Sequence, residues 1–208
     1  PTLDLWPGNR APGGPGPKEA EKVSAKGSVT QVSRPRLVVY RPERPNGTAM
    51  LVIAGGGYAH IERGTESTPA CLWLQSQGVT AFELVYRLPG EHWPAVAPLQ
   101  DGQRAMRVIR ASAQEFGLDT GHIGVMGFSA GGHLAGITAA TPGVARYPLL
   151  DEIDKQSSRP DFAALIYPVL TVMPPFDHPH ARREIVGERP TAEESAALSV
   201  DHLVTARM

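Results

Sequence analysis

Ser129 stands in a setting that suits a nucleophile. It is the centre of Gly127-Phe128-Ser129-Ala130-Gly131, a match to G-x-S-x-G with an apolar strand expected before it and a helix of small residues after it. The turn between such elements is sharp, so side chains two residues before and after the serine would collide, and glycine removes that collision. We therefore predict that Ser129 attacks a carbonyl group. The alternative is a glycine-rich turn whose serine only caps the helix.

A second cluster suits the negative charge that such an attack creates on oxygen. The segment Ala54-Gly55-Gly56-Gly57-Tyr58 ends another apolar run, and glycine lets the backbone adopt positive φ and approach a ligand closely. A tetrahedral intermediate needs at least two N–H donors, each worth roughly 3 kcal/mol of barrier. We expect these donors to be the N–H groups of Gly56, Gly57 and Ala130, with that of Tyr58 as a substitute. A nucleotide-phosphate loop is the disfavoured alternative, because no Lys-Ser/Thr pair and no G-x-G-x-x-G pattern accompanies the glycines.

The general base and its acid have no well-placed candidates after Ser129. A serine hydroxyl needs a positioned histidine, which is itself oriented by an acid. His133 lies four residues along the same helix and is expected to be structural, and Asp161 precedes a strand, at the wrong end of a sheet. We interpret Asp177-His178-Pro179-His180 as a solvated loop rather than a metal site. Asp201-His202 are adjacent, which makes a relay between them sterically awkward.

The elements that must position these residues alternate between strand and helix. Strands are predicted at residues 36–40, 49–54, 79–85, 122–126 and 162–167. Helices are predicted at 68–77, 98–116 and 130–140, with short pieces near 180–186 and 192–198. This alternation predicts an α/β fold, with a mostly parallel sheet, helices on both faces and reactive residues at the carboxyl ends of the strands.

Composition limits the remaining possibilities. The 208 residues suit one α/β domain over 28–208, preceded by a Pro/Gly-rich arm over 1–27 without a core of its own. Twenty basic and twenty-one acidic residues disfavour a nucleic-acid partner, and no stretch approaches the roughly 20 apolar residues of a membrane span. The single cysteine, Cys71, is expected to be a buried thiol. We expect no metal and no organic cofactor.

The first residue is Pro1, and no signal-like apolar segment follows it. We therefore expect that processing or trimming has occurred. A secreted or periplasmic location is expected, and a cytoplasmic one is left open.

Several segments together resemble the acetyl-esterase branch of the α/β-hydrolases, the xylan acetylesterase-like proteins. The segments that carry the resemblance are 54–58, 84–88, 97–101 and 123–133, with weaker likeness at 3–8 and 159–162. The resemblance implies an α/β-hydrolase fold and a serine carboxylesterase that hydrolyses short-chain esters, acetyl above all, on a carbohydrate such as xylan. The acyl group would be carried on Ser129. Two alternatives stay open: another acyl hydrolase, such as a peptidase or lipase, and a non-catalytic binding protein.

The chain departs from that branch in two places. Ala54 replaces the usual His or Pro before the triple glycine, which backbone donors should tolerate. In the branch, a segment like Asp201–Thr205 is followed by another strand, the acid and finally the histidine. We therefore expect the C-terminal part of the fold to be absent from this chain, by about 60 to 80 residues. The chain alone is then expected to be inactive, with the Asp and His supplied by the missing segment or a second chain.

Weaker predictions concern the substrate pocket and one ion pair. His92 and Trp93 follow a strand and are predicted to line the pocket, with plain packing as the alternative for Trp93. Tyr58 is a further weak substrate contact, and surface placement is its alternative. Asp101 and Arg104 have the i,i+3 spacing of a helical ion pair.

Overall fold

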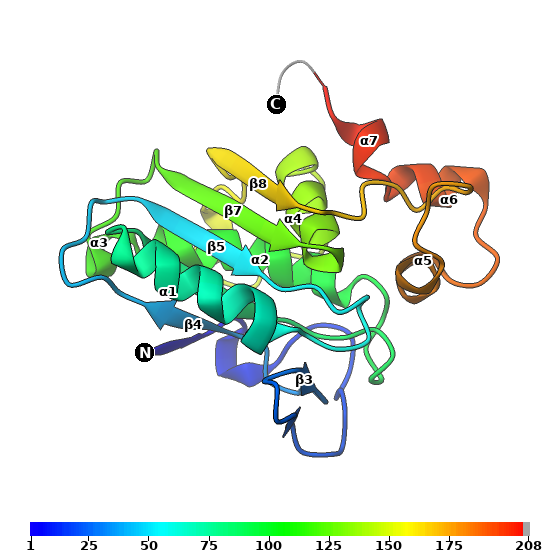
Figure 1. The fold of residues 1–208 in the computed structure, drawn as a ribbon, viewed down its shortest axis with the longest axis horizontal. Helices are drawn as coiled ribbons and strands as arrows, with labels where there is room; N and C mark the ends of the chain where they lie inside the picture. Colours follow the sequence, from blue (N-terminus) through cyan, green and yellow to red (C-terminus); the bar gives the residue numbers. More distant parts are fainter. Residues whose placement is uncertain (206–208) are drawn as a thin grey trace.

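A six-stranded sheet runs through the middle of the molecule (Figure 1). The computed structural model describes residues 1–205. In spatial order the strands are β1 (Thr2–Asp4), β4 (Arg36–Tyr40), β6 (Thr80–Val85), β5 (Ala49–Ile53), β7 (Ile123–Phe128) and β8 (Phe162–Ile166). The last four of these are parallel. At one edge β4 pairs antiparallel with β6, and β1 pairs antiparallel with β4. The sheet is therefore mostly parallel, as predicted.

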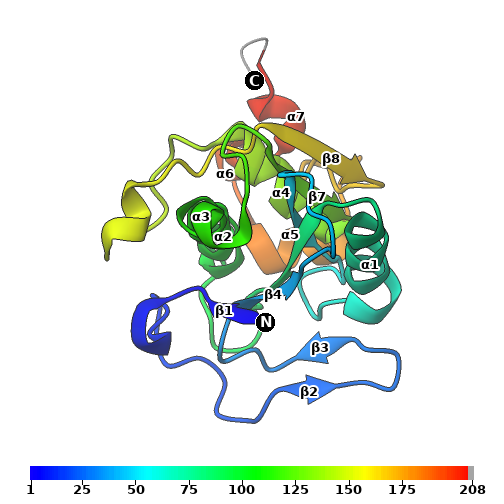
Figure 2. The same cartoon turned by 90° about the vertical axis from the view of Figure 1, so that its left-hand side faces the viewer.

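Helices cover both faces of the sheet (Figure 2). Helix α1 (Thr68–Ser76) lies on one face, and α2 (Ala97–Ala111), α3 (Ala113–Phe116) and α4 (Ala130–Ala140) lie on the other. The single helix predicted at 98–116 is divided at Ser112. It ends at Gly117, which has φ 66° and closes the helix in the left-handed conformation.

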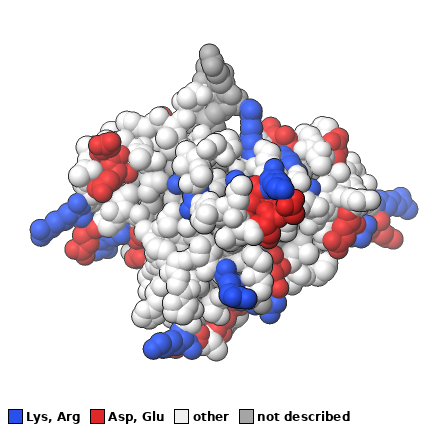
Figure 3. Space-filling model, turned by 180° about the vertical axis from the view of Figure 1, so that it is seen from behind, with Lys and Arg blue, Asp and Glu red and all other residues white. Residues whose placement is uncertain are grey.

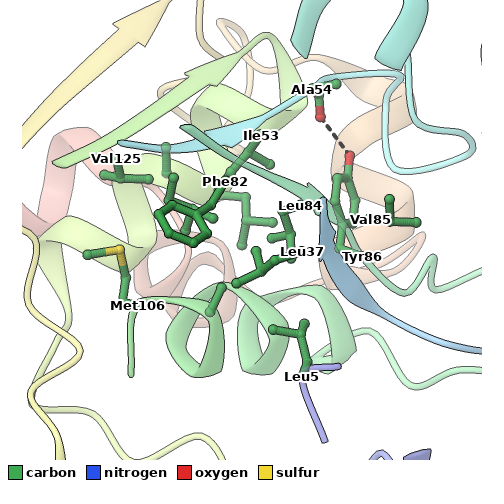
Figure 4. Close-up of a cluster of buried hydrophobic side chains, with 14 of the residues drawn as sticks. Leu5, Leu37, Ile53, Ala54, Phe82, Leu84, Val85, Tyr86, Met106 and Val125 are labelled. Carbon is green, nitrogen blue, oxygen red and sulfur yellow. Dashed lines mark hydrogen bonds between the residues drawn. The ribbon is translucent and has the colours of Figure 1, made fainter. Parts of the chain in front are cut away.

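The central strand β5 is buried at all five positions because both of its faces are covered. Its side chains alternate between the faces, as the strand period requires. Leu51 and Ile53 pack in the larger core, and Met50 and Val52 pack with Cys71 of α1 in a smaller one. Figure 4 shows part of the larger core, in which Phe82, Leu84 and Val125 of the sheet face Met106 of α2. Cys71 is fully buried, as expected, and burial raises the pKa of its thiol.

The N-terminal arm is held to the rest of the chain. Leu5 and Trp6 are 0% and 2% exposed and belong to the larger core. The arm therefore contributes side chains to the core of the main domain and does not form a separate one. A 3-10 turn, η1 (Pro7–Asn9), follows them. A short hairpin of β2 (Lys22–Val23) and β3 (Val29–Thr30) crosses the boundary predicted between residues 27 and 28.

Asp101 does not pair with Arg104, contrary to the predicted i,i+3 ion pair. Both residues point from α2 into the interior, where each meets a partner distant in sequence. Asp101 accepts hydrogen bonds from the side chain of Arg87 (Nε at 3.0 Å) and from Trp6 Nε1 (2.8 Å). Arg104 instead donates to Asp154 (Nη1 to Oδ1, 2.7 Å), which lies in the 3-10 turn η3 (Glu152–Lys155).

Three short helices lie beyond the carboxyl ends of the parallel strands (Figure 1). They are α5 (Pro179–Val186), α6 (Ala192–Ala197) and α7 (Val200–Leu203). The small residues of α4 let this segment pack closely, since a Cβ atom on Gly136 would lie 2.8 Å from Val200 Cγ2. None of the helices formed by residues 1–205 is long and apolar enough to cross a membrane. On the face in Figure 3, acidic and basic side chains are interspersed, in keeping with the net charge of −1.

Candidate active site

Ser129 forms a sharp turn between β7 and α4 and has φ 50° and ψ −117°. Residues other than glycine rarely adopt positive φ, and such strain clusters at functional sites. The serine occupies the N-cap position of α4, but its side chain makes no capping hydrogen bond. It is also partly exposed. The alternative of a simple helix cap is therefore not supported, and the strained turn expected from the sequence is present.

The glycines on either side of Ser129 are required by close backbone contacts. A Cβ atom on Gly127 would lie 2.1 Å from the carbonyl oxygen of Gly131, and one on Gly131 would lie 2.3 Å from the carbonyl oxygen of Ile53. Backbone atoms cannot move aside as the end of a side chain can. The collision predicted from the sequence is therefore confirmed.

Sheet register brings the triple glycine to the serine. Strands β5 and β7 are parallel neighbours, and Ile53 is paired with Gly127. Two residues beyond each member of this pair, a Cβ atom on Gly55 would be 2.8 Å from Ser129 Cβ, so Gly55 lies against Ser129. The two carboxyl strand ends singled out in the sequence therefore meet.

The backbone amides around this turn are free to bind an anion. Gly56, Gly57 and Tyr58 have φ of 118°, 62° and 63°. Their N–H groups, and that of Ala130 at the start of α4, donate no hydrogen bond to any residue in the described part of the chain. The α4 N-terminus adds a partial positive charge. The predicted donors are therefore available, and their binding of an oxyanion stays a prediction.

Two side chains that the sequence analysis missed fix the start of this loop. Tyr86 donates from its hydroxyl to the carbonyl oxygen of Ala54 at 2.9 Å (Figure 4), and burial raises the pKa of that hydroxyl. Glu66 accepts the N–H of Gly55 at 2.6 Å and the hydroxyl of Tyr167 at 3.2 Å. Because Gly55 donates to Glu66, its own N–H is not available to a substrate.

Glu66 is itself held by the π-helical turn η2 (Arg63–Ser67), which is fastened to the sheet through Glu83. The carboxylate of Glu83 is fully buried and accepts hydrogen bonds from Arg63 (2.7 Å) and Ser67 (2.6 Å). Burial alone would raise the pKa of Glu83, but these hydrogen bonds hold it below its usual value. The loop that carries the predicted oxyanion donors is therefore fixed from two sides.

Tyr58 and His133 connect this loop to α4 and to the C-terminal segment. His133 Nε2 donates to the carbonyl oxygen of Leu198 at 2.7 Å, so Nδ1 accepts from the Tyr58 hydroxyl, also at 2.7 Å. Tyr58 is 1% exposed, so its surface-placement alternative is wrong, and its hydroxyl is occupied by His133. His133 is fully buried and structural, as expected, and burial lowers its pKa to about 4.

The other predicted pocket residues are placed differently from each other. Trp93 is 6% exposed, and its Nε1 donates to the carbonyl oxygen of Val32 at 2.8 Å. The centre of its ring also lies 5.0 Å from the guanidinium carbon of Arg87. These contacts favour the alternative given for Trp93, which is plain packing. His92 is exposed and has φ 64°, and its role in substrate binding stays a prediction.

No acid–base relay reaches the serine within residues 1–205, since none of their side chains hydrogen-bonds the Ser129 hydroxyl. Asp161 accepts the N–H of Ile123 at the amino end of β7, the wrong end of the sheet, as expected. His178 accepts the N–H of Ala181 and caps α5. The same residues contain no cluster of three or more His, Cys, Asp or Glu that is suited to a metal.

Comparison with known proteins assigns this architecture to a family. Residues 37–199 match the BD-FAE family model. The chain belongs to the BD-FAE family. This membership confirms the resemblance to the acetyl-esterase branch of the α/β-hydrolases.

Relatives of this BD-FAE chain include the acetylxylan esterase of Xylanibacter ruminicola, which is 32% identical over 145 residues, 70% of this chain and 27% of that protein. Endo-1,4-beta-xylanase B of Butyrivibrio fibrisolvens is 34% identical over 157 residues, 74% of this chain and 24% of that protein. The chain thus spans about a quarter of the length of these relatives.

Solved structures confirm the fold class of the BD-FAE chain. The acetyl ester-xyloside bifunctional hydrolase of Caldicellulosiruptor lactoaceticus is 32% identical, with a TM-score of 0.75 over 99% of this chain and 70% of that one. Native esterase 2 of Thermogutta terrifontis is 27% identical, with a TM-score of 0.67 over 89% of this chain and 66% of that one.

The buried His133 makes the stability of this BD-FAE chain depend on pH. Its pKa is about 4 in the folded state, against 6.5 for a free histidine, so the unfolded chain takes up the proton first as the pH falls. The contribution of neutral His133 to the free energy of unfolding is then fully present above about pH 6.5. It decreases as the pH falls toward 4, by about 1.4 kcal/mol per unit of pKa difference. We expect the free energy of unfolding, measured in urea, to fall between pH 7 and pH 4.5 in the native chain. The fall in His133→Gln is expected to be about 2 kcal/mol smaller. Equal drops in the two proteins would contradict this.

Proposed function

We propose that this BD-FAE family member is a serine carboxylesterase that hydrolyses short-chain esters, acetyl above all, on a carbohydrate such as xylan. The observation that carries the proposal is the strained, uncapped Ser129 beside a glycine-rich loop whose amides are free. The names of its relatives, an acetylxylan esterase and an acetyl ester-xyloside hydrolase, support the substrate.

In the proposed reaction, the hydroxyl oxygen of Ser129 attacks the ester carbonyl carbon, and the carbonyl electron pair moves onto oxygen. The N–H groups of Gly56, Gly57 and Ala130 stabilise this oxyanion, each by roughly 3 kcal/mol. Collapse of the intermediate expels the sugar alkoxide, which takes the proton that the base removed from the serine. Water then attacks the acyl-enzyme in the same way, releasing acetate and restoring Ser129.

We also propose that the histidine and acid of the relay come from a further segment of the protein or from a second chain that pairs with β8. Among residues 1–205, β8 is paired with a strand on one side only, and Phe162 at its start is 39% exposed. A hollow of about 440 Å³ lies next to it, lined in part by Ala139, Pro142 and Ala163. A parallel strand added at this edge would end near the carboxyl end of β7, where Ser129 lies.

A secreted or periplasmic location is part of the proposal, because xylan is a polymer that cells meet outside the membrane. Fractionation of expressing cells tests it. Recovery of the protein in the cytoplasm alone would contradict it.

The proposed activity predicts a preference for small acyl groups. The carboxylate of Glu66 lies beside Gly55, and a polar group of this kind is a poor neighbour for a buried alkyl chain. We expect kcat/KM on p-nitrophenyl acetate to exceed that on p-nitrophenyl octanoate about tenfold or more, with no cleavage of peptides and with release of acetate from acetylated xylan. Preference for the octanoate would indicate a lipase, and peptide cleavage a peptidase.

The same assay tests the source of the relay. A polypeptide of residues 1–208 alone is expected to be about 10³-fold less active than a protein that also contains the relay segment, because serine is a weak nucleophile without its base. Equal activity of the two would show that the base lies within these 208 residues and would overturn the proposed pairing with β8.

A further inference from the structure

Helix α5 lies alongside the glycine-rich loop of the candidate active site. A Cβ atom on Gly57 would lie 2.8 Å from Cδ2 of His180, in the first turn of α5. One turn later, a Cβ atom on Gly90 would lie 3.4 Å from Oε2 of Glu184. Residues four apart share a helix face, so one face of α5 extends from the glycine-rich loop to the loop after β6.

A polar hollow of about 330 Å³ opens beside this face. Glu184 lines it from α5, and Lys22, Thr30 and Gln31 line it from the β2–β3 hairpin and the residue after it. Ala59, just after the glycine-rich loop, lines it as well. The volume is that of a small-molecule site.

A second hollow of about 460 Å³ continues from the first. The two share Lys22, Thr30 and Ala59, and the second extends along the hairpin to Ser28 and to His60 beside the glycine-rich loop. Because they share these lining residues, the two hollows adjoin, and we call them together the hairpin groove. Two adjoining hollows suit a chain of linked units better than a single compact ligand.

The side chains of the hairpin groove supply both hydrogen-bond donors and acceptors. They include an ammonium group (Lys22), hydroxyls (Thr30 and Ser28), an amide (Gln31) and a carboxylate (Glu184). A sugar hydroxyl also donates and accepts, so this mixture matches a neutral polyhydroxyl ligand. Lys22, which is paired with Glu19, shares this lining with the carboxylates of Glu184 and Glu91, so no positive field is present that would select an anion.

One wall of the groove is held in a strained conformation. Gln31 has φ 60°, a value that favours glycine. The carboxylate of Glu91 is 8% exposed and fixes this conformation by accepting the N–H of Gln31 and that of Val32, the latter at 2.8 Å. Strain of this kind persists where the surroundings enforce it, and it clusters at ligand sites.

We infer that the hairpin groove binds the neutral oligosaccharide chain that carries the ester. The oligosaccharide would pass over Ala59 toward His180 and Gly57, which brings its acylated sugar to the glycine-rich loop. The inference rests on the proposed function for its substrate class. Binding of the sugar chain can nevertheless be measured without hydrolysis.

The first test is calorimetric titration of the full-length protein with unacetylated xylohexaose. We compare it with the double variant Gln31→Gly/Glu184→Ala, in which glycine accepts the positive φ of residue 31. Loss of two hydrogen-bonding side chains is expected to raise the Kd about tenfold. Glu115→Ala, which removes an exposed carboxylate on α3 outside the groove, is expected to leave the Kd unchanged. The inference fails if xylohexaose does not bind, or if it binds the double variant equally well.

The second test separates this inference from the proposed function. The double variant is expected to hydrolyse p-nitrophenyl acetate within about twofold of the native rate, because that ester is too small to fill the groove, while its KM for acetylated xylohexaose rises about tenfold. Equal losses of activity on both substrates, or no loss on either, would overturn the inference that the hairpin groove binds the sugar chain. If the native protein binds xylohexaose but hydrolyses no ester, the groove stands and the proposed function fails.

Discussion

Replacement of Ser129 by alanine, in a protein that also contains the relay segment, is expected to lower kcat for p-nitrophenyl acetate by about 10⁴-fold or more. The change removes the only atom that can form the acyl-enzyme in the proposed reaction. It leaves the backbone amides of Gly56, Gly57 and Ala130 in place, so ester binding persists. We therefore expect KM to change far less than kcat. A fluorophosphonate probe, which reacts with activated serines, is expected to label the native protein and not Ser129→Ala.

Ser76→Ala is the matched control for this experiment. Ser76 is an exposed serine whose hydroxyl donates to the carbonyl oxygen of Trp73, and it ends α1 at the opposite end of that helix from η2 and Glu66. Its replacement is expected to leave both hydrolysis and labelling intact. Residual esterase activity in Ser129→Ala equal to that of Ser76→Ala would show that another group is the nucleophile. A native protein that contains the relay segment but is neither labelled nor active would favour a binding protein instead.

The parts of the fold and site that the sequence predicts well are those fixed by neighbours along the chain. Strand β5 reads as a continuous apolar run because helices cover both its faces, and its observed limits differ from the prediction only at residue 54. Helix α4 begins and ends where predicted, since the turn at Ser129 sets its start. Gly127 and Gly131 indicate that turn because the close contact of Gly127 with the carbonyl oxygen of Gly131 is local to it, whereas the contact of Gly131 with Ile53 of β5 is not visible in the sequence.

The parts that the sequence does not predict depend on contacts between distant segments. Glu66 reaches Gly55 only because the turn η2 is fastened to Glu83 of β6. The sequence predicts a helical piece near 180–186, but it assigns His180 to a solvated loop, and only the folded chain places His180 beside Gly57. No spacing or periodicity encodes such meetings. The same holds for the arm, whose Pro and Gly content conceals the fact that Trp6 inserts into the core.

The buried ion pair between Arg87 and Asp101 depends on contacts of this kind, and it supports the active site indirectly. Both side chains are 0% exposed, and Asp101 also accepts the backbone N–H of Arg87 at 2.8 Å. It thereby fixes the end of β6 against α2. The preceding residue, Tyr86, holds the carbonyl of Ala54 at the start of the glycine-rich loop. Loss of the carboxylate is therefore expected to loosen the predicted oxyanion site as well as the core.

Asp101→Ala is expected to lower the free energy of unfolding by about 3–5 kcal/mol, because removing one partner of a buried pair leaves the other charge without compensation. The indole N–H of Trp6 would lose its acceptor as well. Urea unfolding measures the change. Glu152→Ala, which breaks a pair with Lys155 in which the side chains are 85% and 65% exposed, is expected to have no measurable effect. Similar small effects of both variants would mean that solvent or another acceptor compensates Arg87, and that the end of β6 is not held by Asp101.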